Sequence, residues 1–297
     1  MNKRVIAIHL PQFHPFLEND EWWGKGFTEW TNVTKAKPRF LGHYQPHLPS
    51  DTGFYDLRLP EAREMQANMA REYGIYGFCY YHYWFNGKRL MDRPVKEILA
   101  SGQPDFPFML CWANENWSRN WDGKFRNILI EQHYSEEDDI EHMRYLCSKV
   151  FQDTRYIRID GKPVFAIYRS NFFPNMKHTI DVWRKVAKEE YGIELYLIRV
   201  ENEPDFGPKY LDCGFDSAMD FQPLLMGEFN AWWKNLPFRI MNHLFKGKYQ
   251  WFNKHFSYAS YVKYRIKNHW RIINVFRVFH RVGIILLDVK NLPIWLL

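Results

Sequence analysis

Apolar runs of strand length alternate with segments of helical periodicity over most of the chain. Runs of four to eight apolar residues between turn signals are typical of buried strands, and apolar positions three or four apart are typical of helices that cover a sheet. The predicted strands are residues 5–10, 77–84, 107–114, 127–134, 163–169, 194–200 and 215–221. The predicted helices are residues 60–74, 92–102, 135–151 and 178–191. Residues 11–59 are rich in Pro, Gly and aromatic residues, so we expect a long functional loop without helix.

Capping and turn residues mark several of these boundaries. Pro60 fits the first turn of a helix, and Gly192 fits a helix C-terminus. Ser135 is a typical N-cap, and the four acids that follow it complement the helix dipole. Asp160-Gly161 between two apolar runs predicts a tight hairpin turn. These local signals support the predicted order of elements.

The repeated order of strand, loop and helix predicts a parallel sheet with helices outside it. Polar and aromatic residues follow the predicted strand ends, namely His9, 82–84, 114–117, Glu131 and Arg169. A barrel of βα units places its active site at that end of the strands. No glycine-rich phosphate motif follows a strand, which disfavours a nucleotide-binding sheet. We therefore predict an α/β fold of the (β/α)8 TIM type, incomplete at the C-terminus.

The charge of the chain is unevenly distributed. Residues 226–297 contain twelve Lys or Arg and two Asp or Glu, a net charge of +10. Because the whole chain carries +6, residues 1–225 carry −4. The predicted organisation is a catalytic barrel domain in residues 1–225 and a basic, aromatic C-terminal region in residues 226–297. Nucleic-acid binding by the first region is disfavoured on charge.

The remaining composition bears on the compartment. No run of eighteen apolar residues predicts a membrane span, and the start has only about six apolar residues before Pro11, where a signal peptide needs roughly seven or more. The four cysteines are scattered and form no C-x-x-C pair, which fits a reducing compartment. We expect a cytoplasmic protein, with the basic tail either touching an anionic membrane face from inside the cell or forming an ordinary solvated helix.

The segment CWANENWSRNWDG (residues 111–123) combines three tryptophans with carboxylates, amides and an arginine. A buried segment would need partners for all these polar groups, and a plain surface loop would not hold three large apolar rings. Sugars have apolar C–H faces and a rim of hydroxyls, so they match such a combination. The segment therefore predicts a carbohydrate site.

Two carboxylates are the candidate catalytic groups. Glu115 follows the third predicted strand and Glu131 ends the fourth, and neighbouring barrel strands deliver such residues to one mouth. A structural ion pair of Glu131 with Arg126 or Arg155 is the ordinary alternative. Glu29, in GFTEW, and Asp122 are weaker candidates for the same chemistry.

Aromatic and polar residues near the predicted strand ends are the candidate ligand contacts. Alternate residues of FCYYHYW face the barrel interior, so about half of its rings are expected to pack the core. The candidate substrate-binding residues are His9, Gln12, Trp23, Glu29, Trp30, Tyr80, His82, Trp84, Trp112, Asn114, Asn116, Trp117, Arg119, Trp121 and Asp122. The histidine spacings match no common metal motif, so no metal and no cofactor are predicted.

Several motifs resemble those of one known family. They are PQFHP, WWGKGFTEWTNV, GHYQPHLP, GFYDLRLPE, GFCYYHYWF, CWANENW and ILIEQ, between about Ile6 and Gln222. They are similar to the WbsX-like glycosyltransferases of surface-polysaccharide gene clusters and to glycoside hydrolase family 99-like domains.

The resemblance implies a (β/α)8 barrel, a carbohydrate substrate and no metal. ILIEQHY is similar to a family 99 motif that contains a catalytic glutamate, which implies that role for Glu131. The second acid of that motif has no counterpart, because position 134 is Tyr, so Glu115 is the partner carboxylate that we select. The C-terminus also departs from the family, and we hypothesise a frameshift near Phe279 that truncated the barrel.

The resulting prediction is an enzyme that forms or cleaves glycosidic bonds in bacterial surface polysaccharide. Transferase and hydrolase activity stay open, because the family name favours transfer whereas no Asp-x-Asp or glycine-rich diphosphate site is found. The expected partner is an oligosaccharide or polysaccharide, either lipid-linked or used with a nucleotide sugar. The alternative is a glycan-binding protein without catalysis.

Overall fold

Strands from the N-terminal and C-terminal parts of the chain pair side by side and close into a ring. The computed structural model describes residues 4–38, 44–118, 128–201, 212–222, 240, 244, 275–279 and 284–287. The ring strands are β1 (Arg4–His9), β2 (Gly77–Phe85), β4 (Phe108–Trp112), β8 (Lys162–Ile167), β9 (Tyr196–Glu201), β10 (Ser217–Gln222), β11 (Val275–Phe279) and β12 (Ile284–Leu287). Their neighbours pair in parallel, except that β12 runs antiparallel to β11 and β1. The predicted α/β barrel class is confirmed, and the antiparallel β12 makes its βα repeat incomplete.

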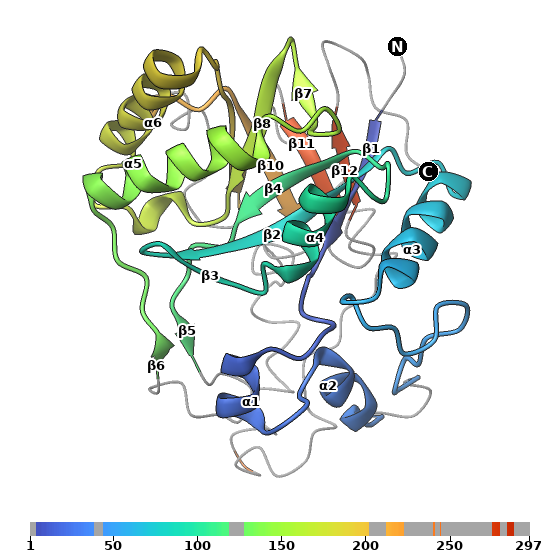
Figure 1. Cartoon of the computed structure of the whole chain (residues 1–297). Coiled ribbons are helices and arrows are strands. Elements are labelled where there is room, and N and C mark those ends of the chain that lie inside the picture. Colours follow the sequence, from blue (N-terminus) through green and yellow to red (C-terminus); the bar gives the residue numbers. More distant parts are fainter. Residues whose placement is uncertain are drawn as a thin grey trace.

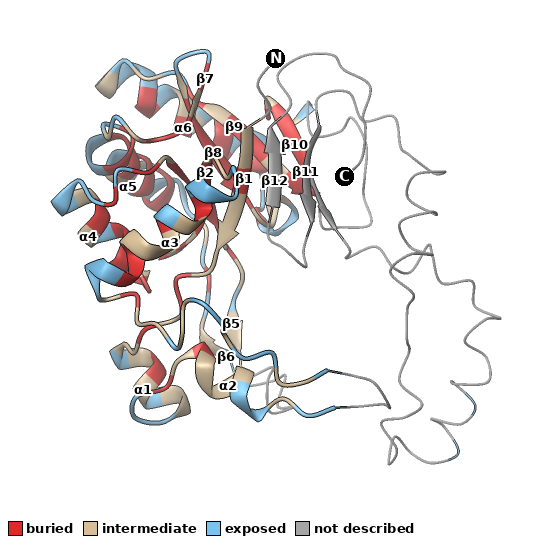
Figure 2. Ribbon diagram, turned by 90° about the vertical axis from the view of Figure 1, so that its right-hand side faces the viewer, coloured by how far each residue is buried: buried red, intermediate tan, exposed pale blue. Residues whose placement is uncertain are grey.

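Four helices follow the strands of the first half of the ring. They are α3 (Pro60–Glu72), α4 (Arg93–Ser101), α5 (Glu136–Tyr145) and α6 (Met176–Tyr191). A π-helix at Leu146–Val150 extends α5, and a 3-10 turn at Ser170–Phe172 precedes α6. Figures 1 and 2 show these four helices on the outer side of the curled sheet. This alternation from β1 to β9 matches the predicted order of elements except at residues 11–59 and 127–134.

The predicted end signals act as expected. The Ser135 side chain accepts a hydrogen bond from the Asp138 backbone N–H and caps α5. Gly192 ends α6 in the left-handed conformation, with φ of +66°. Asp160 and Gly161 both have positive φ and join β7 (Arg158–Ile159) to β8 as a hairpin.

The prediction of a loop without helix for residues 11–59 is wrong. Two short helices lie in it, α1 (Leu17–Trp23) and α2 (Glu29–Lys35). Each has two turns, and Gly24 and Gly26, both with positive φ, separate them. The helices escaped detection because glycine and proline flank them so closely that neither shows a long periodic pattern. In Figures 1 and 2 they lie together beyond the end of the sheet where β1 finishes.

The predicted fourth barrel strand, residues 127–134, lies elsewhere. Its ordered core is β6 (Ile128–Ile130), which pairs antiparallel with β5 (Trp117–Ser118) in a separate two-stranded sheet. In the ring, β4 pairs directly with β8, for example Leu110 with Phe165. The short apolar run is compatible with any strand, and only tertiary pairing selects its partner. The β5–β6 sheet lies near α1 in Figure 1.

The main core lies between the sheet and helices α5 and α6. Trp112 of β4 and Trp183 of α6 are fully buried there, with ring centroids 5.9 Å apart. Burying an indole removes roughly 150–250 Å² from water, about 4 to 6 kcal/mol of transfer free energy each. Gly77 begins β2 at a close approach, because an added Cβ would lie 2.6 Å from the Pro107 carbonyl oxygen.

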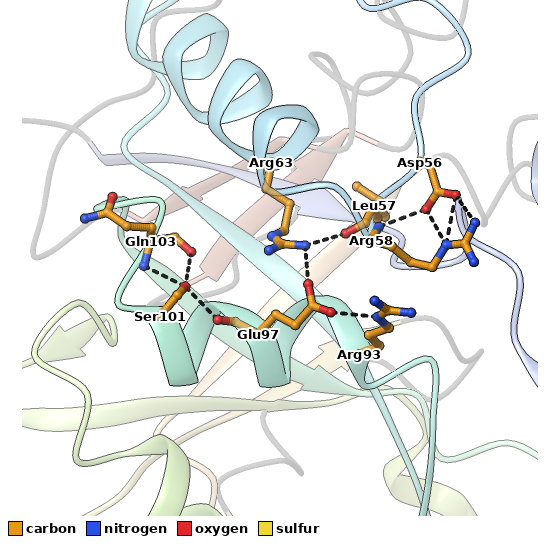
Figure 3. A network of polar contacts seen from close by, with 8 residues as sticks. All are labelled: Asp56, Leu57, Arg58, Arg63, Arg93, Glu97, Ser101 and Gln103. Carbon is orange, nitrogen blue, oxygen red and sulfur yellow. Dashed lines mark hydrogen bonds and ion pairs between the residues drawn. The ribbon is translucent and has the colours of Figure 1, made fainter.

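A polar network fastens the loop before α3 to α4. The Arg63 guanidinium on α3 donates to the Leu57 carbonyl and to the Glu97 carboxylate on α4, both at 2.7 Å (Figure 3). Arg93 donates to the other oxygen of Glu97 at 2.6 Å, and Arg58 forms an ion pair with Asp56. Since Arg63 is buried, its pairing with Glu97 satisfies a charge that would otherwise be costly.

Parts of the C-terminal region belong to the ring. Strands β11 and β12 pair with β10 and β1, whereas most of residues 226–297 lie outside the described residues. The predicted boundary at residue 225 and the frameshift near Phe279 therefore stay predictions. In the part of the chain that the structure describes, no helix is long and apolar enough to span a membrane.

Candidate functional site

An ion pair joins the ends of two neighbouring strands. Glu115 follows β4 and Arg169 follows β8, and the Arg169 Nε–H donates to Glu115 Oε1 at 2.6 Å. The Arg169 guanidinium also lies over the rings of Tyr168 and Phe172, with its carbon 5.1 and 5.8 Å from their centroids. Strand pairing and ring contacts thus place one carboxylate and one cation at the C-terminal end of the parallel strands, where a barrel carries its active site.

Aromatic rings gather beside this ion pair. Trp117 of β5 stacks on Tyr83 of β2, with centroids 5.4 Å apart and planes 20° from parallel. Trp22 of α1 meets Trp117 edge-on at 5.4 Å, and Phe16 lies 6.4 Å away. Both Tyr83 and Trp117 retain exposed surface. Partly exposed flat rings next to charged groups suit the apolar faces of a sugar.

Glu29 is the buried carboxylate of this region. It is the first residue of α2, and the Asn32 side-chain amide donates to its carboxylate at 3.4 Å. Burial is the main cause that raises the pKa of Glu29 above its ordinary value. Burial also raises the pKa of the Tyr83 hydroxyl, and the charges of Glu29 and Glu115 both add to that effect. The two carboxylates therefore lie near the same phenol.

Glu131 lies on the outer part of the β5–β6 ribbon. It follows β6, its side chain is 55% exposed, and its carboxylate lies 3.7 Å from His133. The neighbouring Gln132 N–H donates to the Asn116 side chain at 2.8 Å, which ties this segment to the loop after Glu115. The alternative partner Arg155 instead pairs with Asp153, and Arg126 lies outside the described residues. Glu131 therefore borders the loop that carries Glu115, and it remains a predicted catalytic group.

The side chains of a second set of predicted site residues pack against the helices. His82 of β2 contacts His142 of α5, and Trp84 stacks on the same imidazole at 4.5 Å. Trp112 is fully buried, and its indole N–H donates to the Trp84 carbonyl. Because side chains alternate along a strand, Tyr83 between His82 and Trp84 faces the opposite side. These three residues are packed behind the sheet and are not brought to the mouth.

Two further residues share that outer face. His9 of β1 hydrogen-bonds Gln66 of α3 at 2.9 Å, and its ring lies 4.7 Å from that of Tyr80. Burial lowers the pKa of His9 to about 4, so it is neutral at pH 7. Tyr80 is also buried, between His9, Phe78 and Phe108. His9 therefore connects β1 to α3, whereas Tyr80 packs among residues of the strands.

The remaining predicted contacts lie in the N-terminal segment and the β4 loop. Trp30 donates its indole N–H to the Tyr55 carbonyl, and Trp23 stacks near Phe27, so both brace that segment. Gln12 is buried near its start. Asn114 is fully buried and Asn116 is exposed. The positions of Arg119, Trp121 and Asp122 lie outside the described residues.

Other mouth residues escaped the sequence analysis. Trp22 contacts Trp117, and Tyr134 contacts Asn114. Tyr83 and Arg169 were recognised at predicted strand ends, Tyr83 as a possible stacking ring, but neither was included in the final set of candidate substrate-binding residues. The available signal was the alternation of FCYYHYW. Either of its two alternating sets of side chains could face the barrel interior, and only packing shows which set does. Within the described ranges, no three His, Cys, Asp or Glu side chains gather as a metal site.

The family profile described as "Glycosyltransferase WbsX" matches residues 5–282. The chain belongs to the WbsX glycosyltransferase family. This WbsX-family chain is 42% identical over 219 residues to "Uncharacterized protein WxcX" of Xanthomonas campestris pv. campestris strain B100. The match covers 74% of this chain and 31% of that protein, so the chain spans about a third of the relative's length.

Solved structures give weaker similarities. A GH99 endo-alpha-mannosidase from Bacteroides thetaiotaomicron has a TM-score of 0.45 and 12% identity, covering 82% of this chain and 68% of that one. A "Glycoside hydrolase-like protein" has a TM-score of 0.42 and 16% identity, covering 64% and 62%.

Proposed function

We propose that this WbsX-family chain forms or cleaves glycosidic bonds in a bacterial surface polysaccharide. Family membership supports a sugar substrate. The observation that carries the proposal is the Glu115–Arg169 ion pair beside the Tyr83–Trp117 stack, with the buried Glu29 nearby. This arrangement combines a ring surface for sugar with two carboxyl groups in different environments.

Chemistry at a glycosidic bond uses two carboxyl groups in different protonation states. One gives a proton to the departing oxygen, and the other stabilises positive charge on the sugar or deprotonates the attacking hydroxyl. A carboxyl group whose pKa is raised by burial suits the role of the acid. Glu115 contacts a guanidinium and serves as the negative group. Glu29, whose pKa burial raises, retains its proton to higher pH and serves as the acid.

Glu131 remains a second candidate for the negative group. It was selected from its position at the end of a predicted strand and from the family resemblance, and its exposed position beside the loop of Glu115 allows contact with a bound chain of sugars. Transfer and hydrolysis use the same two carboxyl roles and differ in whether a sugar hydroxyl or water attacks. Assays with both kinds of acceptor therefore distinguish the two activities.

The test pairs glycan analysis with purified protein. A strain that lacks the gene is complemented with the wild-type chain or with Glu115→Gln, Glu29→Gln, Glu131→Gln or the control Glu64→Gln, an α3 surface position. Purified proteins are assayed on the extracted glycan with and without sugar nucleotides. We expect Glu115→Gln and Glu29→Gln to lose about 100-fold or more of the turnover while binding glycan as wild type. Glu64→Gln should retain full activity.

Two results would contradict the proposal. If all three acidic variants restore the glycan as well as wild type, the carboxylates have no catalytic role. If wild type binds glycan and turns over neither glycan nor sugar nucleotide, the chain is a glycan-binding protein instead. In that case Trp117→Ala should reduce binding, because the indole provides the stacking surface.

A further inference from the structure

We propose that Asn114 and Tyr134 form a clamp that positions the Arg169–Glu115 ion pair. The clamp is defined here as the Asn114 side chain and the Tyr134 hydroxyl. The inference rests on the proposed role of Glu115 for its catalytic consequence, whereas the clamp's geometry stands independently of it. It changes the predicted role of Asn114 from a sugar contact to a positioning residue.

The Asn114 side-chain amide both accepts a hydrogen bond from the Arg169 backbone and donates one to it. Its Oδ1 accepts from the Arg169 N–H at 2.8 Å, and its Nδ2 donates to the Arg169 carbonyl at 2.8 Å. The second Nδ2 hydrogen goes to the Tyr134 hydroxyl at 3.0 Å. Asn114 has no exposed surface. With its oxygen and both N–H groups engaged inside the protein, the side chain stabilises the strand ends and has no donor left for a ligand.

Tyr134 closes the clamp from a third segment. Its hydroxyl donates to the Asn114 carbonyl at 2.8 Å while accepting from Asn114 Nδ2. The residue lies between β6 and α5, and its ring packs 4.4 Å from that of Phe173. Burial raises the pKa of the Tyr134 hydroxyl, so this group stays protonated and remains a donor. The ends of β4 and β8 are thereby held to the segment that precedes α5.

The clamp acts on both partners of the ion pair. Glu115 is the next residue after Asn114, so the Tyr134 bond to the Asn114 carbonyl fixes the start of the Glu115 backbone. Arg169 is held by its own N–H and C=O. The Asn114 amide thus spans the two strands next to the 2.6 Å contact between the side chains, and it adds to the backbone bond from the Tyr168 N–H to the Trp112 carbonyl. Displacing a catalytic group by about 1 Å can reduce the rate 100-fold, so such positioning is functionally important.

Tyr156 provides a matched control on the same two strands. Its buried hydroxyl accepts from the Leu110 N–H of β4 at 3.1 Å and donates to the Val164 carbonyl of β8 at 2.8 Å. Like the Tyr134 hydroxyl, it makes one donor and one acceptor bond, but its two partners lie on β4 and β8 whereas both partners of Tyr134 belong to Asn114. It contacts the middle of β4 instead of its end, so its loss should affect stability without moving the ion pair.

The experiment compares Tyr134→Phe with Tyr156→Phe in the full chain. Three quantities are measured: the melting temperature, the ¹H–¹⁵N signal of the Arg169 Nε–H assigned through Arg169→Lys, and kcat and KM on the glycan. Glu115→Gln shows how far the Arg169 signal moves when the ion pair loses its charge. Each Tyr→Phe change removes the hydrogen bonds of one hydroxyl, which should lower the melting temperature by roughly 2 to 4 °C.

The expected result separates positioning from stability. Both variants should lose similar melting temperature, but only Tyr134→Phe should shift or broaden the Arg169 signal and lower kcat about 10- to 100-fold with little change in KM. An Arg169 signal that is unchanged in Tyr134→Phe, or equally changed in Tyr156→Phe, would overturn the clamp.

The two proposals fail in different ways. If Tyr134→Phe moves the Arg169 signal while Glu115→Gln retains full turnover, the clamp stands and the catalytic role of Glu115 falls. If Glu115→Gln abolishes turnover while Tyr134→Phe leaves both signal and kcat as in wild type, the catalytic role stands and the clamp falls.

Discussion

The Nε2 atoms of His82 and His142 lie 3.0 Å apart in the buried layer between β2 and α5. At this distance one neutral imidazole donates to the other, and the donor follows from the tautomers. Burial lowers the pKa of His82 to about 3, with the nearby Arg89 charge adding to the effect, and it lowers the pKa of His142 well below its usual value. The pair is therefore neutral at pH 7.

This pair predicts a loss of stability in acid. A folded-state pKa below the unfolded value of 6.5 contributes stability that is present above pH 6.5 and declines as pH falls toward 3. The contribution of His82 alone is on the order of 4 kcal/mol over that range. Groups around the pair include Arg89, Tyr145 and Asp138, which accepts the Trp84 N–H. Urea unfolding from pH 7.5 to 4.5 measures the effect.

His142→Gln is the informative variant for this prediction. It should be less stable than wild type at pH 7.5, and the difference should shrink as the pH falls, because the wild type then loses the contribution of the pair. His133→Gln, at an exposed site, serves as the control and should follow the wild type. A constant difference across the pH range would show that the pair does not titrate with folding.

For Glu29 we predict the opposite dependence of stability on pH, because its contribution is lost as the pH rises. Its folded pKa is raised by burial, so its contribution to stability is fully present below the unfolded value of 4.5 and is lost as pH rises through the folded pKa. Glu29→Gln keeps the shape and removes the charge, so we expect a higher free energy of unfolding than wild type at pH 8. The gain should vanish near pH 4. Denaturant curves at the two pH values test this, and a less stable variant at pH 8 would refute it.

Two tryptophans of one motif should respond differently to truncation. Trp112→Ala empties a fully buried site and should cost about 3 to 5 kcal/mol of unfolding free energy. Trp117 is only partly buried, so Trp117→Ala should cost under about 1.5 kcal/mol and chiefly weaken glycan binding. Chemical denaturation and a glycan-binding assay separate the effects. Equal losses of stability would mean that Trp117 is also a core residue.

Arg155 should contribute far more to stability than an exposed arginine. It pairs with Asp153 at 2.6 Å and donates to the Pro104 and Ile98 carbonyls, so it joins the C-terminus of α4 to the segment before β7. Arg155→Ala leaves a nearly buried carboxylate unpaired and should cost about 3 to 5 kcal/mol. Arg144→Ala breaks the exposed pair with Glu190 and should change the stability little, because solvent screens that pair. Thermal unfolding of both variants provides the comparison.

Local sequence signals predicted much of the fold. The helix that begins at Pro60, the cap at Ser135 and the hairpin at Asp160-Gly161 all appear where expected. These features depend on residues within a few positions of one another, so a single segment contains the information. The two short helices of residues 11–59 were missed because two turns are too short to establish a periodic pattern.

The candidate site could be predicted only in part. Glu115 was selected from its position after a strand, and the structure places it in an ion pair at the mouth. The alternation in FCYYHYW showed that half of its rings face inward without showing which half, and the tight packing of His82 and Trp84 against α5 decides it. The same packing leaves Tyr83 to meet Trp117. The cysteines give a similar example. Cys111 of β4 contacts Cys79 of β2, and this hydrogen bond together with burial raises the pKa of the Cys111 thiol. The scattered cysteine positions in the sequence did not suggest that contact.

The sequence by itself determined the order of the first βα units, the ends of the longer helices and the type of chemistry to look for. These properties follow from backbone preferences and side-chain types that act over one or two turns. Only the tertiary structure decided that β4 pairs with β8, that residues 128–130 leave the ring, and that Asn114 grips Arg169 from 55 positions away. The reason is physical: which strands pair and which faces are buried depends on the free energy of packing the whole chain, and no short segment contains that information.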